Sequence, residues 1–449
     1  MKCFTDDLRP LIPLYIAMFL EAVGSGIVAS VLTVVARDDL GCSAVQTGII
    51  WSSYNAGLIL GSIVAGYTSD RIQRQCVLVL TLIWVGSSYL FTAFAGSFEL
   101  FLASRIITGI CGGAYPIAAS ILSSTLSTEA LPTAVGRLGS MTSLGFAVGG
   151  LVSTGINGIW DVNSTSPFYI QRMYFFVTTA VYFLAAIVAS RVTRAITESR
   201  IAEGVETNQG GGKVTAGLCL IWSSRFYATA AVVSVYVTQA ALWRGYLDLP
   251  RVVISLLITL SGIVVSLTQW FAFPWLVRRI GFHAALGFGI SLICLACACI
   301  GPATENNMIS LHMICMVIFW IGLGCMEPGT PVAVTRHLKR AAATLPTGFR
   351  KAWNVMHPGS AMGITSAMKY GASLVFPPLA GLVFDNHSMI LFYCVSAVAG
   401  LGVLCVLLAS RLYNKLPNCI PETEKIEEVS LTDSALAPEA STVDHVDRV

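Results

Sequence analysis

Four charged residues lie inside long apolar stretches of the sequence: Glu21, Arg105, Glu327 and Lys369. A charge at the centre of a bilayer costs at least about 2.5–3.5 kcal/mol on insertion scales, so such residues usually face a partner or a water-filled cavity. A carboxyl group can take up and release a proton, whereas an arginine keeps its charge. We therefore predict that Glu21 and Arg105 form a proton-coupling site.

Glu21 is the better proton carrier because it lies near the middle of its apolar stretch. Burial favours the protonated form of a carboxyl group and a nearby guanidinium favours the ionised form, so a balanced group can load and release a proton. Glu327 and Lys369 are possible cavity charges. For all four residues the alternative is a buried salt bridge with a purely structural role.

The composition requires a membrane protein. The chain has 449 residues, of which 55% are hydrophobic and 11% are charged, and its mean hydropathy is +0.74. Soluble proteins carry roughly 25% charged residues. The apolar residues are spread along the whole chain, whereas a membrane β-barrel would show short alternating segments.

A span needs about 20 mostly apolar residues. On that rule the sequence predicts twelve transmembrane helices in an all-α membrane protein, at residues 11–35, 45–67, 76–95, 99–121, 135–155, 169–190, 226–243, 252–277, 282–301, 309–333, 360–383 and 389–411. Residues 214–224 are predicted as an interfacial stretch.

The spans divide into two sets of six, separated by a polar, glycine-rich segment. The predicted organisation is a cytoplasmic N-terminus at 1–10, a bundle at 11–190, a linker at 191–218, a second bundle at 219–411 and a cytoplasmic tail at 412–449. From Pro417 the tail is acidic and rich in Ser and Thr, so we expect it to be disordered.

The distribution of basic residues predicts the orientation. The predicted inner loops and helix starts hold most of the Lys and Arg residues, whereas the outer loops hold Arg37, Arg244 and Arg251. This bias places both termini in the cytoplasm. Asn163 begins an Asn-x-Ser/Thr sequence in a predicted outer loop and is a possible glycosylation site.

A short charged turn at residues 66–74 joins the second and third spans, and four of its residues match a known pattern: Gly66, Asp70, Arg71 and Arg74. The turn resembles the signature loop between helices 2 and 3 of the major facilitator superfamily, Gly-x-x-x-Asp-Arg-x-Gly-Arg-Arg. The match is partial, because Gln73 stands where the family usually has glycine and Gln75 where it often has a basic residue.

The resemblance implies that this turn is a conformational latch. We expect Asp70 to lie near the start of helix 11, around Ser360, where the helix dipole favours a carboxylate by roughly 0.3–1 kcal/mol. Arg137 is a possible second partner of Asp70. The alternative is an ordinary turn in a positively charged loop.

Two spans carry small residues at every fourth position, namely Ser53, Gly57, Gly61 and Ala65 in one and Gly359, Gly363, Ala367 and Gly371 in the other. Such spacing lets helix backbones approach closely. Helices 2 and 11 meet between the two halves in the superfamily, so the resemblance implies a sliding seam formed by Gly57, Gly61, Gly363 and Gly371. Alternatively, each stripe packs inside its own half.

Two further motifs point to one branch of the superfamily. Arg105 stands four residues before Gly109, which resembles the helix 4 motif. Residues 145–150 are similar to the Gly-Pro-x-x-Gly-Gly element of the drug:proton antiporters of the tetracycline-resistance-like branch, with Phe146 in place of proline. Helices 1, 4, 7 and 10 line the central cavity in this superfamily, and Glu21, Arg105 and Glu327 fall in that set.

The sequence offers no pattern for other chemistry. Cys294, Cys297 and Cys299 share a span without His or carboxylate neighbours, so we interpret them as small apolar residues. The chain has no phosphate-binding glycine-rich loop and no hydrolase or protease constellation. We expect no metal, no cofactor, no nucleic acid and no enzymatic activity.

These features predict a secondary transporter of a small organic solute that works by alternating access and is coupled to protons, with antiport favoured. The alternatives are a facilitative uniporter or symporter of the same fold and, from another class, a non-transporting scaffold or receptor. The expected partners are the solute, protons and the lipid bilayer, and the expected state is a monomer. The protein is predicted to be a multi-pass protein of the plasma membrane or an organelle membrane.

Overall fold

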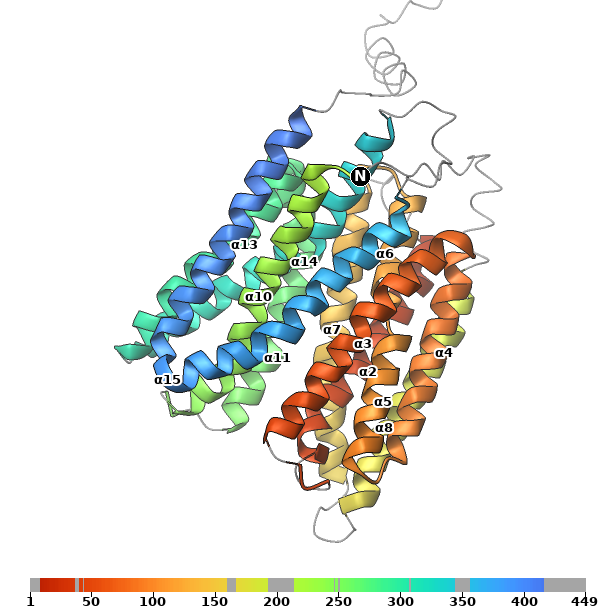
Figure 1. Ribbon diagram of the computed structural model, residues 1–449, viewed down its shortest axis with the longest axis vertical. Helices are drawn as coiled ribbons and strands as arrows, with labels where there is room; N and C mark the ends of the chain where they lie inside the picture. The colour runs from red at the N-terminus through yellow and green to blue at the C-terminus, as the bar shows by residue number, and fades with distance from the viewer. Residues whose placement is uncertain are drawn as a thin grey trace, which may run out of the picture.

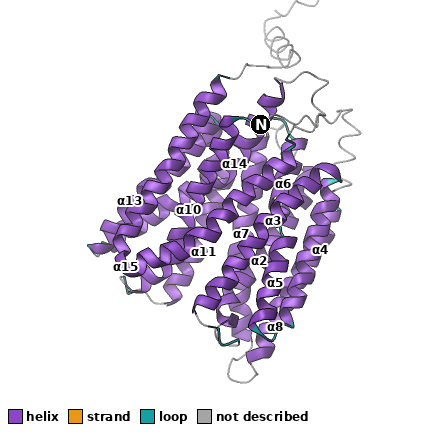
Figure 2. Ribbon diagram, in the orientation of Figure 1, coloured by secondary structure: helices purple, strands orange, loops and turns teal. Residues whose placement is uncertain are grey.

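The structure is a computed structural model that describes residues 9–36, 40–42, 44–159, 167–192, 214–245, 247–248, 251–306, 308–343 and 356–415. Most of these residues are helical, and they include no β-strand (Figure 2). Twelve stretches among them are long and apolar enough to cross a membrane. The predicted all-α fold with twelve spans is therefore confirmed, while Asn163 lies outside the described residues.

The first bundle follows a 3₁₀ turn, η1 (Arg9–Leu11), and its helices are α2 (Ile12–Val34), α3 (Ala44–Arg71), α4 (Arg74–Ala93), α5 (Phe98–Cys111), α6 (Ala114–Thr125), α7 (Leu131–Ile159) and α8 (Pro167–Ser190). Helices α5 and α6 together form one span. They are separated at Gly112 and Gly113, and Gly113 has a φ of +127°, a conformation that side chains other than glycine rarely adopt.

The helices of the second bundle are α10 (Ala216–Gly245), α11 (Arg251–Leu267), α12 (Phe273–Ile280), α13 (Phe282–Glu305), α14 (Ile309–Ala343) and α15 (Pro358–Asn414). A π-helical segment, η3 (Thr268–Ala272), joins α11 to α12 within one span. Helix α15 holds two spans, Pro358–Phe384 and Met389–Asn414, and Figure 1 shows its ribbon folding back on itself between them.

The two bundles meet at one end of the molecule. Helix α3 packs against α15, and α7 packs against α11, η3 and α14. The ribbons of the two bundles converge at the end where α2 begins and diverge toward the opposite end (Figure 1). We call the converging end the inner end, since the bias of basic residues predicts that it faces the cytoplasm.

Helix α10 begins earlier than the sequence predicts. Its first residue is Ala216, so most of the stretch at 214–224 is helical and not a separate interfacial segment. The span expected at 226–243 begins just after Arg225. Arg225 instead lies inside the span Ala216–Gln239, where a carboxylate from another helix neutralises it.

Candidate functional site

Asp70 joins the two bundles at the inner end. Its Oδ1 accepts a hydrogen bond from the backbone N–H of Gly359 at 2.8 Å, and its Oδ2 accepts from the backbone N–H and the hydroxyl of Ser360, both at 2.7 Å. Helix α15 begins at Pro358, so the carboxylate caps the positive end of this helix. The predicted contact between Asp70 and the region of Ser360 is confirmed.

The cation beside Asp70 is Arg74, with Nη2 at 3.3 Å from Asp70 Oδ1. Arg74 also donates from Nη1 to the backbone carbonyl of Ser120 at 3.5 Å. The guanidinium of Arg71 lies 4.2 Å from the ring centroid of Tyr67 and takes no part in this contact. Of the residues predicted to form a latch, Asp70 and Arg74 therefore contact other elements, whereas Arg71 contacts Tyr67 of its own helix.

Arg137 is not the second partner of Asp70 in this structure. Its guanidinium lies 5.2 Å from the ring centroid of Trp270 on η3. Among the described residues, no ion pair joins Arg137 to Asp70. Arg74, the first residue of α4, reaches Asp70 across the turn between α3 and α4 and fills that place instead.

The glycine stripes divide between two interfaces. A Cβ on Gly363 would lie 2.5 Å from the carbonyl oxygen of Ser62 and 3.4 Å from Cα of Gly66, so these residues form a close contact between the bundles. A Cβ on Gly57 would instead lie 2.8 Å from Cα of Gly109, and one on Gly61 would lie 2.6 Å from the Gly109 carbonyl oxygen.

The predicted seam therefore needs correction. Gly57 and Gly61 pack against α5 inside the first bundle, which is the alternative that the sequence left open. Gly371 has Phe226 of its own bundle as its neighbour, 3.8 Å from an added Cβ. The four-residue spacing is the same at both interfaces, so it cannot tell which helix each glycine faces.

Sequence reasoning missed a second seam between the bundles, between α7 and η3. A Cβ atom added to Gly139 would lie 3.0 Å from Oε1 of Gln269. The same oxygen accepts a hydrogen bond from the hydroxyl of Ser143 at 3.1 Å. The hydroxyls of Ser140 and Ser266 are 2.7 Å apart. A π segment such as η3 turns its side chains out of helical register, and the sequence carries no simple signal for one.

Glu21 lies midway along α2 and is held by two hydroxyl groups. Tyr182 donates to Glu21 Oε1 at 3.3 Å and Ser25 donates to the same atom at 3.4 Å, while the two hydroxyls are 2.9 Å apart. Gly24 allows the Tyr182 ring to lie against α2, because an added Cβ would be 2.6 Å from that ring. No Lys or Arg among the described residues forms an ion pair with Glu21.

Arg105 is almost completely buried, with 2% of its surface exposed. Its guanidinium lies 4.4 Å from the ring centroid of Tyr54 and 5.7 Å from that of Tyr89. Nε and Nη1 find no hydrogen-bond partner among the described residues. The Tyr89 and Tyr182 rings, 5.4 Å apart, stand between Arg105 and Glu21. The two predicted proton-coupling residues thus share a tyrosine cluster without touching.

The second bundle holds a triad of charges. Arg225 Nη2 lies 2.7 Å from Glu327 Oε2, and Lys369 Nζ lies 3.4 Å from Glu327 Oε1. These residues come from α10, α14 and α15. The sequence identifies Glu327 and Lys369 as candidates but not Arg225. A carboxylate inside a span requires a cation nearby, and Arg225, beside a predicted span, was available for that place.

The charges of the two bundles interact across the space between them. Lys369 interacts electrostatically with Glu21. Lys369 also contacts Oε1 of Glu327. The structure therefore brings Glu21, Lys369 and Glu327 into one electrostatic neighbourhood, although no ion pair links the two bundles there within the described residues.

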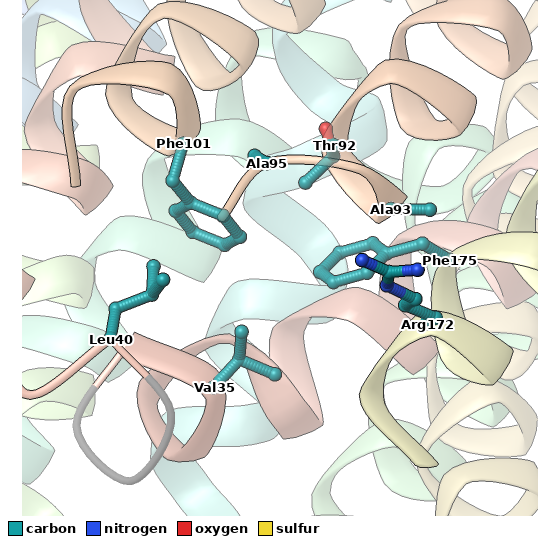
Figure 3. A pocket seen from close by; sticks show the side chains of 8 residues that line it. All are labelled: Val35, Leu40, Thr92, Ala93, Ala95, Phe101, Arg172 and Phe175. Atoms are coloured by element: carbon teal, nitrogen blue, oxygen red, sulfur yellow. The ribbon is translucent and has the colours of Figure 1, made fainter. Parts of the chain in front are cut away.

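A small hollow lies away from these charges, among α2, α4, α5 and α8 at the end opposite the inner end (Figure 3). The side chains that line it are mostly apolar: Val35, Leu40, Thr92, Ala93, Ala95, Phe101, Arg172 and Phe175. The Phe101 and Phe175 rings meet edge to face with centroids 6.0 Å apart. With no carboxylate among its lining residues, this hollow offers no proton site.

Residues 14–354 match the family model described as Major Facilitator Superfamily. The chain belongs to this superfamily. It is 28% identical to the tetracycline resistance protein, class B, of Escherichia coli over 199 residues, which are 44% of this chain and 48% of that protein. It is 23% identical to the quinolone resistance protein NorA of Staphylococcus aureus (strain MRSA252) over 418 residues, or 91% of this chain and 98% of that protein.

The superfamily fold is also found by structure. The human organic anion transporter MFSD10 superposes with a TM-score of 0.69 at 17% identity, covering 90% of this chain and 99% of that one. At such an identity the likeness concerns the fold alone. The predicted membership of the superfamily is confirmed, and the drug-resistance relatives agree with the predicted branch. The chain is a multi-pass membrane protein of a family of transporters, not enzymes.

Proposed function

We propose that this superfamily member moves a small organic solute across a membrane by alternating access, coupled to protons and favouring antiport. The observation that carries the proposal is the environment of Glu21: two hydroxyl groups hold the carboxylate, and no cation among the described residues pairs with it. Such a group can bind and release a proton without breaking a salt bridge. Two relatives are named as a tetracycline resistance protein and a quinolone resistance protein, which supports proton-coupled export of an organic solute.

Arg105 is proposed as the fixed charge of this site. It cannot lose its proton, and its guanidinium is held between Tyr54 and Tyr89 rather than by a carboxylate. The tyrosine cluster would transmit a change at Glu21 to Arg105, because Tyr182 touches both Glu21 and Tyr89. Protonation of Glu21 removes the negative charge nearest to this cluster.

Alternating access requires the inner end to open and close. The contact of Asp70 with α15 and the two seams would keep this end shut in the arrangement described. With both termini in the cytoplasm, as we propose from the basic residues, this arrangement is the outward-open state. Opening inward requires Asp70 to release the first turn of α15 while α3 slides over Gly363.

Two other modes are weighed against antiport. Symport is the second candidate, and it is supported by the electrostatic interaction of Lys369 with Glu21. A solute that neutralised Lys369 would favour the protonated form of Glu21, so the solute and the proton would move together. Facilitated diffusion needs no proton site. A scaffold or receptor that kept the fold would carry no flux.

The test is flux through the purified full chain in proteoliposomes, with a panel of organic solutes and with or without a pH gradient. Antiport predicts solute movement against the direction of proton flow, symport predicts movement with it, and facilitated diffusion predicts no effect of the gradient. Glu21→Gln should abolish the effect of the gradient, and Glu305→Gln, at an exposed carboxylate, should keep it. Failure of every solute to move would remove the transport proposal.

A further inference from the structure

We propose that the triad of Arg225, Glu327 and Lys369 binds the anionic group of the solute, and that the solute is an aromatic carboxylate. This inference rests on the proposed transport function and specifies its substrate class. The triad occupies the second bundle, opposite Glu21, and takes its residues from three helices.

The charges of the triad do not cancel. One carboxylate, that of Glu327, faces two cations, at 2.7 Å from Arg225 and 3.4 Å from Lys369. The triad as a whole therefore carries one excess positive charge. Glu21 of the first bundle, the other carboxylate in this neighbourhood, offsets this excess only while it is ionised. Once Glu21 is protonated, the excess has no counter-charge among the described ion pairs. Because isolated charge is costly inside a membrane protein, the triad then calls for an anion.

The hydrogen-bond donors of the triad are also in excess. Arg225 uses Nη2 for Glu327 and Nη1 for the thioether of Met326 at 3.1 Å, a weak acceptor, and its Nε has no partner among the described residues. Lys369 has three donors and Glu327 accepts one of them. A ligand that complements this surplus is rich in acceptors, as a carboxylate is.

Lys369 is within reach of a ligand. Its side chain is 38% exposed even while the ammonium contacts Glu327, whereas that of Arg225 is 4% exposed. A lysine pointed at lipid from the middle of a span would be unfavourable, so this exposed part faces the space between the bundles. The side chain can contact Glu327 with one proton and an incoming anion with another.

The surroundings of the triad suit an aromatic frame. Phe226 follows Arg225 in α10, and its ring lies 5.8 Å from that of Phe376, two turns beyond Lys369 on α15. From the first bundle, Tyr115 lies within electrostatic range of Glu327 and Arg225, and its buried hydroxyl has no partner among the described residues. These partly exposed rings offer stacking surface beside the cation.

Three probes with one ring system separate the charge classes: 1-naphthoate, 1-naphthalenemethanol and 1-naphthylmethylamine. The purified full chain is heated with increasing concentrations of each probe, and the shift of the unfolding midpoint gives its affinity. We expect 1-naphthoate to bind about tenfold or more tightly than the other two, the size expected for a hydrogen bond to a charged group. Lys369→Gln should abolish this preference.

Two controls keep the test independent of folding. Lys369→Gln leaves Glu327 paired with Arg225, and Lys369→Arg should retain the preference because it retains the charge. Lys415→Gln makes the same substitution at an exposed residue just after α15 and should bind like the wild type. Each midpoint is compared with that of the same variant without a probe.

The outcomes decide the proposal. Absence of a shift with 1-naphthoate, equal shifts with all three probes, a larger shift with the amine, or an unchanged preference in Lys369→Gln each overturns it. Because binding is measured without transport, the two proposals can fail separately. Anion-selective binding without flux would remove the transport proposal and keep the proposed anion site. Flux of other solutes without anion-selective binding would remove the anion site and keep the transport proposal.

Discussion

Asp70 and Ser360 are joined by two hydrogen bonds, since one carboxylate oxygen accepts from both the backbone N–H and the hydroxyl of Ser360 at 2.7 Å. The two residues belong to different bundles, so every inward opening must break this contact. The other oxygen of the same carboxylate accepts from Gly359. Asp70 therefore links the two bundles at the inner end through both of its oxygens.

Asp70→Asn should shift the equilibrium toward an open inner end. The amide group can accept only with one oxygen and would turn N–H groups toward the donors of Ser360, and each charge-assisted hydrogen bond lost costs about 1.5–3 kcal/mol. Ser62, which is fully buried in the closed seam, is replaced by cysteine in a protein whose exposed native cysteines are removed. Labelling of this cysteine should be higher when Asp70→Asn is also present. Arg71→Gln, at an exposed position that contacts Tyr67, is the control. Unchanged labelling in Asp70→Asn would show that the contact does not hold the closed state.

Gly363 and Gly371 form a matched pair for testing the seam. An added Cβ would lie 2.5 Å from the Ser62 carbonyl oxygen at Gly363 but 3.8 Å from the nearest ring atom at Gly371. Gly363→Ala should therefore reduce solute flux in proteoliposomes strongly, and Gly371→Ala should leave it within about twofold, since surface-like changes cost under about 0.5 kcal/mol. Equal flux from the two folded variants would remove Gly363 from the moving contact.

Gly57→Ala should act differently from Gly363→Ala, because Gly57 packs against α5 in its own bundle. An added methyl group there would separate two helices that do not move relative to one another, so we expect a lower unfolding midpoint. Overpacking typically costs about 1–3 kcal/mol. A thermal unfolding curve checks this, and an unchanged midpoint together with lost flux would restore Gly57 to the sliding seam.

The sequence predicts the fold well because the signals are local. Each span is a long apolar run, and basic residues mark the loops, so length and composition are enough to locate the helices. The contact of Asp70 with the start of α15 is predictable through the resemblance of the turn at 66–74 to the superfamily loop, because the two residues are 290 positions apart and no local signal connects them. Gly57 and Gly363 show the limit: their spacing is identical, and only the packed structure distinguishes their neighbours.

The candidate site is less predictable because its partners are far apart in sequence. Arg225 looks like a span boundary until Glu327, 102 residues later, is placed 2.7 Å away. Gln269 gives no signal at all, because its contact with Ser143 depends on the π segment η3. Glu21 and Arg105 are both identified as buried charges, but the sequence does not reveal that tyrosines separate them.

Glu327 is the acceptor that stabilises the triad, so Glu327→Gln should destabilise the second bundle more than Lys369→Gln. Loss of the carboxylate leaves Arg225, which is 4% exposed, next to Lys369 without a counter-charge, and an uncompensated buried charge costs about 3–5 kcal/mol. Lys369→Gln removes a partly exposed charge and leaves an ion pair. Thermal unfolding of both variants, with Glu305→Gln as the control, measures the difference, and equal midpoints would contradict this role of Glu327.

Glu21→Gln separates proton coupling from solute binding. Glutamine keeps the size of the side chain and can still accept hydrogen bonds from Tyr182 and Ser25, but it cannot bind or release a proton. Uphill transport driven by a pH gradient should therefore vanish, while downhill solute exchange should survive at least in part. Retained pH-driven uptake would remove Glu21 from the coupling mechanism, and loss of both activities in a folded protein would make it a solute ligand.

Arg105→Lys tests the fixed charge in the same assay. Lysine keeps the charge but loses the planar guanidinium that lies against Tyr54 and Tyr89, so it cannot reproduce both ring contacts. We expect pH-driven uptake to fall, and the loss of roughly 1–2 kcal/mol of cation–π interaction to lower the unfolding midpoint by a few degrees without unfolding the protein. Arg279→Lys, whose guanidinium lies 5.9 Å from the ring centroid of Trp275 at the exposed end of α12, repeats the same exchange outside the site and should transport normally. In the described residues Arg105 and Glu21 are linked through Tyr182 and Tyr89, so pH-driven uptake in the variant that combines Arg105→Lys with Glu21→Gln should be no lower than in Glu21→Gln alone.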